Sequence, residues 1–394
     1  MPHKLDALRI ALIGTRFMGK AHSNAWLCAN RFFDLPLTVQ MHTICGRDES
    51  DTHAFAKRWG WDHASTSFDE VMSDSAINLV DIGTPNHVHR EQAMAALAAG
   101  KHVACEKPLA GTLADARAMR DAALRVRKKG LRTFVWFNYR RCPAVAMAHQ
   151  IVKSGRLGTI YHIRAQYLQD WAGPKTPMSW RFKASEAGSG AHGDLNAHII
   201  DMARFITGDE VREVNGAIQE TFIKSRPLPP DARRKSKNTA TGKSDVDDCS
   251  LFLARFRKGT VASFEASRLA TGNKNRNTIE INGEHGSLKF DFERMNELQW
   301  WDDTIESRLR GWSTILCTTP NDHPYIDAYW PPGHLIGYEH QFISQAADIV
   351  LSLAGKTPLI PIPDFDDAFQ TQRVLEAATV AAREKRTVLI SEIK

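Results

Sequence analysis

In the first third of the chain, short apolar runs alternate with amphipathic stretches. The apolar runs have the length and composition of buried strands, whereas the stretches between them repeat their apolar positions with a helical period. Regular alternation of the two predicts a doubly wound parallel α/β sheet. The strand-like runs lie at 8–13, 38–45, 78–82, 102–105 and 133–137, and the helical stretches lie at 20–29, 52–59, 87–99 and 113–129.

Strand-like runs outnumber helical ones in the rest of the chain, which predicts an α+β domain with a large open, mainly antiparallel sheet. A chain of 394 residues also exceeds what one hydrophobic core usually organises, and we place the domain boundary at residue 138. The polar segment 224–247 is expected to form a long, mobile loop. The expected strands lie at 159–168, 211–222, 250–257, 260–267, 278–281, 297–301 and 387–390, and the expected helices lie at 335–354 and 365–384.

Composition excludes several classes of protein. The 51 basic and 45 acidic residues give a net charge of only +6, which favours small anionic ligands over nucleic acid. The six cysteines form no Cys-x-x-Cys pair and lie mostly in apolar runs, so we expect reduced core residues. No apolar targeting segment precedes the first strand and no apolar run is long enough for a membrane span, so a cytoplasmic location is expected.

A glycine turn joins the first strand to the first helix. In a dinucleotide fingerprint the first glycine makes the tight turn, the second admits the pyrophosphate and the third packs the helix on the strand. Gly14 and Gly19 fit the first and third roles, whereas Arg16 occupies the second position. Arg16 can instead pair with a cofactor phosphate, and Phe17 and Met18 would lie in the same turn. The alternative is a chance strand–turn–helix.

The turn after the second strand bears on the choice of cofactor. A dinucleotide site usually presents an acid here to the ribose hydroxyls, or an arginine to a 2′-phosphate. Gly46 aligns with the acidic position, and Arg47 follows it, which favours NADP over NAD. Asp48 is close enough in sequence to favour NAD instead.

The turn after the third strand contains Thr84, Pro85 and Asn86, with His89 three residues further on. It lies at the carboxyl edge of the expected sheet, where such sheets bind ligands, so we expect cofactor contacts from these residues. The alternative is a proline turn in which Asn86 only caps the next helix.

Glu106 and Lys107 follow the fourth strand at the same edge. Pro108 restricts Lys107 to an extended conformation, which would direct its ammonium out of the sheet toward a bound nicotinamide. The alternative is a solvated surface lysine, the usual fate of this residue type.

A glycine-rich segment at 188–193 runs into a second candidate site. If a helix begins near Gly193, Asp194 and His198 are one helical turn apart and share a face, which pairs a carboxylate with a proton acceptor. The alternative is that Asp194 only caps the helix and His198 is an ordinary helix residue. A metal site formed by Asp194, His198 and Asp201 would be a coincidence of spacing. The sequence has no His-Glu-x-x-His motif and no clustered Cys/His spacing, so no metal is expected.

In their order and combination, these motifs resemble the Gfo/Idh/MocA family of NAD(P)-dependent sugar and polyol oxidoreductases; Arg16 in the glycine motif is the main departure. The resemblance implies a Rossmann dinucleotide-binding domain at 1–138 and a domain for substrate binding and oligomerisation at 139–394. It further implies NADP or NAD as cofactor, a homodimer or homotetramer, and no nucleic-acid or membrane partner.

Two aromatic and polar stretches, 167–171 and 179–182, combine ring faces with amide and guanidinium donors, the mixture that holds a polyhydroxylated ring. Subunit interfaces use the same residue types, which is the alternative. With these stretches, the chain most resembles the branch that includes levoglucosan, glycoside and inositol dehydrogenases. That resemblance implies substrate contacts from Tyr139, Gln169, Trp171 and Arg181.

The resemblance also implies hydride transfer from a ring secondary hydroxyl, such as that at C3, of a sugar, anhydrosugar, glycoside or cyclic polyol. His198 would be the base, Lys107 would stabilise the developing alkoxide, and Asp194 would hold hydroxyls and bias His198. Two rival functions are a nucleotide-binding regulator without catalysis and a glycoside-cleaving enzyme that uses its cofactor only transiently.

Overall fold

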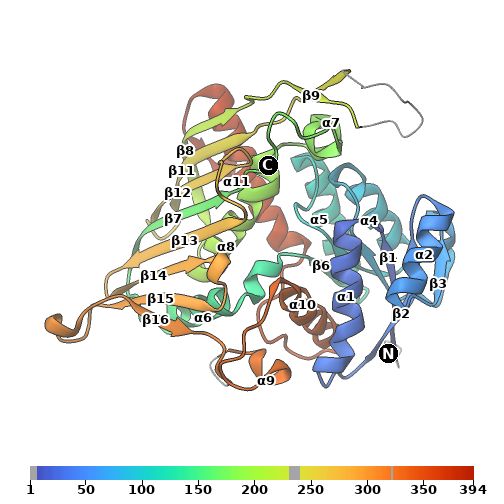
Figure 1. The fold of residues 1–394 in the computed structure, drawn as a ribbon, viewed down its shortest axis with the longest axis horizontal. Coiled ribbons are helices and arrows are strands. Elements are labelled where there is room, and N and C mark those ends of the chain that lie inside the picture. Colours follow the sequence, from blue (N-terminus) through green and yellow to red (C-terminus); the bar gives the residue numbers. More distant parts are fainter. Residues whose placement is uncertain (1–6, 230–239, 321–322) are drawn as a thin grey trace. The chain divides into compact units, whose positions relative to one another are not determined.

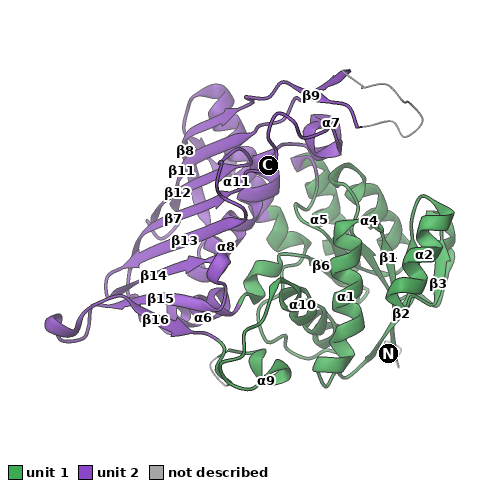
Figure 2. Cartoon of the chain, viewed as in Figure 1, with its two compact units in different colours: residues 1–110, 114–142, 318–369 green, residues 111–113, 143–317, 370–394 purple. Residues whose placement is uncertain are grey.

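The computed structural model describes residues 7–229, 240–320 and 323–394 (Figure 1). The chain divides into two compact units, which Figure 2 shows in different colours. Unit 1 is made of residues 1–110, 114–142 and 318–369, and unit 2 is made of residues 111–113, 143–317 and 370–394, apart from the residues outside the described ranges.

Unit 1 contains a six-stranded sheet in the order β3-β2-β1-β4-β5-β6, and every neighbouring pair is parallel. This order confirms the predicted doubly wound sheet, because it starts near the centre and is extended on both sides. Strand β3 was not predicted, since it is short and lacks an apolar run. The strands are β1 (Ala7–Ile13), β2 (Thr38–Cys45), β3 (His63–Ser65), β4 (Leu79–Ile82), β5 (His102–Cys105) and β6 (Thr133–Val135).

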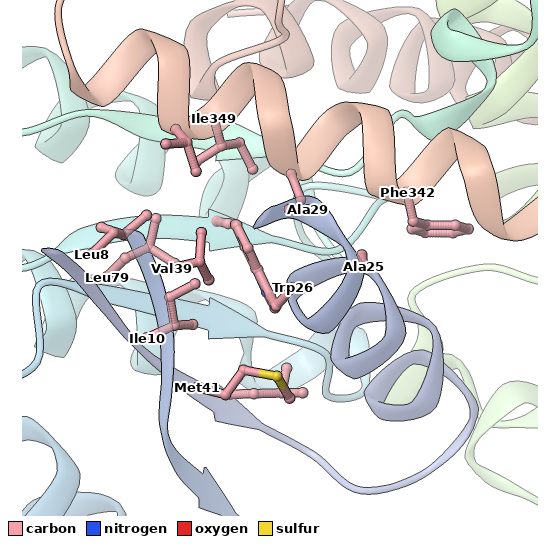
Figure 3. Packing of buried hydrophobic residues seen from close by; sticks show 14 of the residues in the cluster. Leu8, Ile10, Ala25, Trp26, Ala29, Val39, Met41, Leu79, Phe342 and Ile349 are labelled. Carbon is pink, nitrogen blue, oxygen red and sulfur yellow. The ribbon is translucent and has the colours of Figure 1, made fainter. Parts of the chain in front are cut away.

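Helices α1, α2 and α10 of unit 1 share a continuous apolar core with this sheet. Trp26 on α1 lies among strand residues such as Ile10 and Leu79, and Figure 3 shows these side chains beneath the helix that carries Phe342 and Ile349. The helices are α1 (Phe17–Phe32), α2 (Glu49–Trp59), α3 (Phe68–Ser73), α4 (His89–Ala98), α5 (Leu113–Arg127), α9 (Ile326–Tyr329) and α10 (Tyr338–Leu353).

The compact units differ from the predicted division at residue 138. Residues 318–369 return to unit 1, because α10 packs directly on α1 and contributes Phe342 and Ile349 to the core of that unit. The helical period of 335–354 predicted the helix itself but carried no information on which unit it joins.

Unit 2 contains a nine-stranded sheet in the order β16-β15-β14-β13-β7-β12-β11-β8-β17. Only β7 and β12 pair in parallel, so the sheet is mainly antiparallel, as predicted. Helices α6 (Pro143–Lys153) and α8 (Ala197–Thr207) pack against the sheet, and α11 (Phe365–Glu384) lies near the end of the chain. The strands are β7 (Ile160–Leu168), β8 (Val211–Glu220), β11 (Cys249–Phe256), β12 (Val261–Ser267), β13 (Arg276–Gly283), β14 (Gly286–Asp291), β15 (Glu297–Asp302), β16 (Ser313–Leu316) and β17 (Val388–Leu389).

Part of the segment expected to be a mobile loop is instead an ordered ribbon. Strands β9 (Ser225–Pro227) and β10 (Thr241–Lys243) pair antiparallel, whereas residues 230–239 lie outside the described residues. The buried Arg226 explains the order, since its guanidinium donates to the carbonyls of Ala172 and Gly173 and to the carboxylate of Asp248 at 2.9 to 3.0 Å. The polar composition of segment 224–247 therefore did not reveal that Arg226 forms a buried ion pair with Asp248.

All six cysteines are free thiols; four are buried and two are partly buried, as predicted. In the described part of the chain, no helix is long and apolar enough to cross a membrane.

Candidate active site

The turn after β1 has the geometry of a dinucleotide cradle. Gly14 adopts a φ of +113°, and a Cβ there would lie 2.9 Å from the carbonyl oxygen of Gly83. A Cβ on Gly19 would lie 2.2 Å from the oxygen of Gly14, so glycine is required at both positions. Helix α1 begins at Phe17, and the exposed Arg16 just before it caps no backbone N–H with its side chain. The first N–H groups of α1 can therefore bind a phosphate.

The turn after β2 presents an arginine to solvent. The N–H of Gly46 donates to Ser65 O at 3.1 Å, and a Cβ on Gly46 would lie 2.1 Å from the hydroxyl of Thr52. Arg47 is exposed, whereas the Asp48 carboxylate accepts from the N–H of Asp51 at 2.8 Å and so caps α2. Asp48 is thus engaged in the helix cap.

The buried imidazole of His89 contacts the main chain of the turn after β4. The imidazole is fully buried, with Nε2 2.9 Å from Thr84 O and Nδ1 3.2 Å from Pro108 O. Burial is the main reason why the pKa of His89 is lowered. The Thr84 hydroxyl donates to Gln92 at 2.7 Å. His89 was expected to contact the cofactor; the structure instead places it in the interior, where it joins the turns after β4 and β5.

The turn after β5 carries Lys107, which is partly exposed. Its N–H donates to the Glu106 carboxylate at 3.0 Å, and the peptide bond between Lys107 and Pro108 is cis. Glu106 is buried, with 5% of its surface exposed. The carboxylate therefore holds the main chain from which Lys107 projects.

Two buried residues that the sequence reading missed lie behind this turn. His22 on α1 has Nε2 3.1 Å from Glu106 and Nδ1 3.1 Å from Asp81 on β4. Burial alone would lower the pKa of His22, but the carboxylates of Asp81 and Glu106 together raise it to about 9. The available signal was Asp81 itself, because a carboxylate inside an apolar strand needs a buried partner.

In unit 2, the glycine-rich segment leads into a π-helix, His192–Asn196, which α8 continues. The prediction of a regular α-helix around Asp194 was wrong at this turn. At the start of this turn, the two carboxylate oxygens of Asp247 accept from the N–H groups of Gly190 and His192, both at 2.7 Å. His192 is further held by Leu375 O, 2.8 Å from its Nε2. Asp247 thus performs the capping role considered for Asp194, and π-helical turns are frequent at functional sites.

Asp194 faces a buried arginine that was not predicted. Arg268 Nη1 lies 3.8 Å from Asp194 Oδ2, and Arg268 is only 1% exposed. Its guanidinium lies 5.5 Å from the ring of Trp171 and 5.4 Å from that of Phe182. Burial lowers the pKa of Arg268, while Asp194 and Asp247 oppose that effect.

The polar and aromatic stretch at the end of β7 lies beside His198. The rings of His198 and Tyr167 are 5.8 Å apart. Asn275 accepts from both Tyr167 Oη and Gln169 Nε2 at 2.7 Å, and Gln169 in turn accepts from the indole N–H of Trp171 at 2.7 Å. Because 39% of Trp171 remains exposed, an indole face is available for stacking. His198 itself is 8% exposed.

The remaining two expected substrate contacts have different surroundings. Arg181 is partly exposed, and its guanidinium lies 4.3 Å from the ring of Trp180. Tyr139 is only 4% exposed and belongs to unit 1, in the short helix Asn138–Arg141. That helix is anchored internally, since Arg141 donates to the buried Asp348 at 2.9 Å. The structure therefore places Tyr139 in the interior of its unit.

Among the described residues, no group of three or more His, Cys, Asp or Glu side chains is arranged to hold a metal ion. The nearby Asp201 is buried and lies 4.0 Å from Arg204.

Comparisons with known proteins agree with this architecture. Residues 8–136 match the model of an oxidoreductase family with an NAD-binding Rossmann fold, and residues 145–289 match the GFO/IDH/MocA C-terminal domain. The chain is 39% identical over 397 residues to levoglucosan dehydrogenase of Pseudarthrobacter phenanthrenivorans, which covers 99% of this chain and 100% of that protein.

Two solved structures are similar over nearly the whole chain. An oxidoreductase domain protein from Kribbella flavida is 48% identical with a TM-score of 0.92, covering 98% of this chain and 100% of that one. Levoglucosan dehydrogenase in complex with NADH and levoglucosan is 40% identical with a TM-score of 0.89, covering 97% of this chain and 99% of that one.

The Rossmann strand order and the glycine cradle of unit 1 agree with the NAD-binding match, and the mainly antiparallel sheet of unit 2 contains much of the second match. The resemblance expected from the sequence motifs is confirmed. The chain belongs to the Gfo/Idh/MocA family of NAD-binding oxidoreductases.

Proposed function

We propose that the protein oxidises a ring secondary hydroxyl, such as that at C3, of a sugar, anhydrosugar, glycoside or cyclic polyol, with NAD or NADP as the hydride acceptor. The observation that carries the proposal is the cluster in unit 2 that combines the exposed indole of Trp171, the amide of Gln169 and the carboxylate of Asp194 with the imidazole of His198. The similarity to levoglucosan dehydrogenase, solved with levoglucosan, supports the same class of substrate.

This cluster has the chemistry that a polyhydroxylated ring requires. The indole of Trp171 covers the apolar face of the ring, while Gln169 and Asp194 bind hydroxyls at its edge. Asn275 fixes the amide of Gln169, and Arg268 fixes the carboxylate of Asp194 from its buried side. Both polar groups are therefore held in place before a sugar binds, which lowers the entropic cost of binding.

The residues of the glycine turn fit a dinucleotide. The N-terminus of α1 and Arg16 would hold the pyrophosphate, since the first N–H groups of α1 have no side-chain cap from Arg16. The tight turn that leads into α1 requires glycine at positions 14 and 19, where a Cβ would collide with neighbouring backbone. When bound, the nicotinamide supplies the acceptor for the hydride. The exposed Arg47 favours NADP, whereas the NADH present in the related levoglucosan dehydrogenase complex favours NAD.

His198 would take the proton of the reacting hydroxyl as a general base, and Lys107 would orient that hydroxyl and stabilise the alkoxide that develops. Asp194 would bind a neighbouring hydroxyl and bias the orientation of His198. These roles require one hydrogen-bond acceptor and one cation, which is the chemistry of an imidazole and an ammonium group.

The function is tested by mixing the purified protein with NAD or NADP and a panel of levoglucosan, glucose, methyl glucoside and myo-inositol, while following reduced cofactor at about 340 nm. A dehydrogenase accumulates reduced cofactor with at least one of these compounds. A regulator binds the nucleotide and leaves it oxidised, and a glycoside-cleaving enzyme releases methanol from methyl glucoside without net reduction. Either of the latter results would refute the proposal.

We expect His198→Ala and Lys107→Ala each to lower kcat by about 100-fold or more, the usual contribution of a positioned acid–base group. His162→Ala and Lys57→Ala are matched controls, because His162 lies on β7 near Arg164 and Glu280, and Lys57 is exposed in the last turn of α2. Near-normal kcat in His198→Ala would remove the base assignment.

A further inference from the structure

A buried series of hydrogen bonds in unit 1 ends at the main chain of Lys107. Asp81 on β4 accepts from Nδ1 of His22 at 3.1 Å, and Nε2 of the same ring lies 3.1 Å from Glu106 Oε1. The other oxygen of Glu106 accepts from the N–H of Lys107 at 3.0 Å. His22 and Asp81 are fully buried, so water does not compete for these contacts.

The donors and acceptors of this series assign a positive charge to His22. A neutral imidazole donates from only one nitrogen, whereas both nitrogens of His22 face carboxylate oxygens. Asp81 also accepts from the indole N–H groups of Trp26 at 2.7 Å and Trp136 at 2.8 Å, so it acts purely as an acceptor. The ring of Trp136 lies 4.3 Å from that of His22, a contact that stabilises a cation.

We propose that His22 is a positioning residue for Lys107. As an imidazolium, His22 fixes the Glu106 carboxylate, and this carboxylate in turn holds the backbone N–H of Lys107. The inference rests on the role proposed for Lys107 above. A displacement of about 1 Å at a catalytic group can lower turnover about 100-fold, so a remote residue that fixes this main chain matters to the reaction.

In the part of the chain that the structure describes, none of the other titratable groups that face His22 is a cation. Within the described residues, those that face it are Asp81 from β4 and Glu106 from the turn after β5, with the thiol of Cys105 next to them. Burial and the two carboxylates raise the pKa of Cys105 well above its usual value, so it stays a neutral thiol. His22 is therefore the cation that balances this cluster.

The experiment compares His22→Gln with the wild type and with His42→Gln, a partly buried histidine of the same unit that hydrogen bonds Thr43 instead. Lysine reactivity is measured by competitive labelling with acetic anhydride and mass spectrometry, in the absence of sugar, with the exposed Lys57 as internal reference. The kcat, the KM for sugar and the melting temperature are measured on the same proteins.

We expect His22→Gln to raise the labelling of Lys107 about threefold or more, and to lower kcat about tenfold or more while KM changes less than about twofold. The control should match the wild type in each quantity. Glu106→Gln provides a second variant, which should shift Lys107 labelling in the same direction even where His22→Gln fails to fold.

Unchanged Lys107 labelling in both His22→Gln and Glu106→Gln would overturn the inference, as would a fall in melting temperature with kcat and KM altered in parallel, because that pattern marks a purely structural histidine. If the wild type reduces no cofactor with any sugar but the labelling of Lys107 still shifts, the proposed function fails and the positioning of Lys107 by His22 stands.

Discussion

The imidazolium at His22 makes the stability of unit 1 depend on pH in a window where few other groups titrate. The pKa of His22 is raised from 6.5 to about 9 because Asp81 and Glu106 outweigh the burial of the ring. Below pH 6.5 the imidazole is protonated in both the folded and the unfolded chain, so the stabilisation is complete. As pH rises toward 9 the unfolded chain loses its proton first, and the stabilisation is lost.

The size of the effect follows from the same values. At about 1.4 kcal/mol for each pH unit, a pKa raised from 6.5 to about 9 corresponds to about 3 kcal/mol of stability. About 2 kcal/mol of this should be lost between pH 7 and pH 8.5. For a unit of this size the loss corresponds to a fall in melting temperature of about 4 to 8 °C.

Other groups in the unit titrate outside this window. Burial lowers the pKa of His89, and lowers that of His102 to about 4. Both imidazoles are therefore neutral in the folded protein above pH 6.5, and their contribution to the free energy of unfolding is nearly constant from pH 7 upward. The thiols of Cys45 and Cys105 have raised pKa values, and their contribution to stability is lost only above the ordinary thiol value of 9.0. The slope between pH 7 and 8.5 therefore reports His22.

The measurement is urea unfolding followed by tryptophan fluorescence, since Trp26 and Trp136 both hydrogen bond Asp81 and report on this cluster. The wild type and His42→Gln should lose stability across the window, whereas His22→Gln should start lower and show no such slope. A wild-type protein equally stable at pH 7 and pH 8.5 would refute the reasoning, and so would parallel slopes in wild type and His22→Gln.

Three further perturbations probe other parts of the molecule. Gly190→Ala should lower the free energy of unfolding by more than about 3 kcal/mol, because its Cβ would lie 1.7 Å from Asp247 O. Gly173→Ala is the control in the same denaturation assay; it should unfold like the wild type, because no atom lies within 4 Å of the new Cβ. Arg47→Ala should raise the Kd of NADP about tenfold and leave that of NAD unchanged, and equal effects in a fluorescence titration would argue against a 2′-phosphate contact. Trp171→Ala should raise the KM for sugar about tenfold with little change in kcat, and an unchanged KM would remove the stacking role.

The sheets were predictable because their sequence signal is local. In β1 and β4, Leu12 and Leu79 are fully buried on strands that sit inside a parallel sheet, so the apolar runs are nearly continuous. In β11 buried and exposed positions alternate, as a half-covered antiparallel strand requires. The return of α10 to unit 1 was not predictable, since the partner of an amphipathic helix is decided by packing with α1, hundreds of residues away in the chain.

The candidate site shows the same division between local and distant information. Gly14, Gly19 and Lys107 were predictable because a turn geometry or a strand end places them. The ribbon formed by Arg226 was mistaken for a loop, since the residues that make its guanidinium buried lie 22 to 54 positions away.

Three buried aspartates, Asp81, Asp247 and Asp348, make contacts between distant segments that the sequence did not predict. Asp81 gathers donors that lie 55 and 59 positions away, Asp247 gathers two that lie 55 and 57 positions away, and Asp348 accepts from Arg141, 207 positions away. A buried carboxylate is costly unless several donors converge on it, so each one determines how distant segments meet. An aspartate within an otherwise apolar run is therefore a usable sequence signal: it indicates that donors from elsewhere in the chain must lie beside it. In this chain Asp81 is such an aspartate, and its donor His22 belongs to the series of hydrogen bonds that holds the main chain of Lys107 in place.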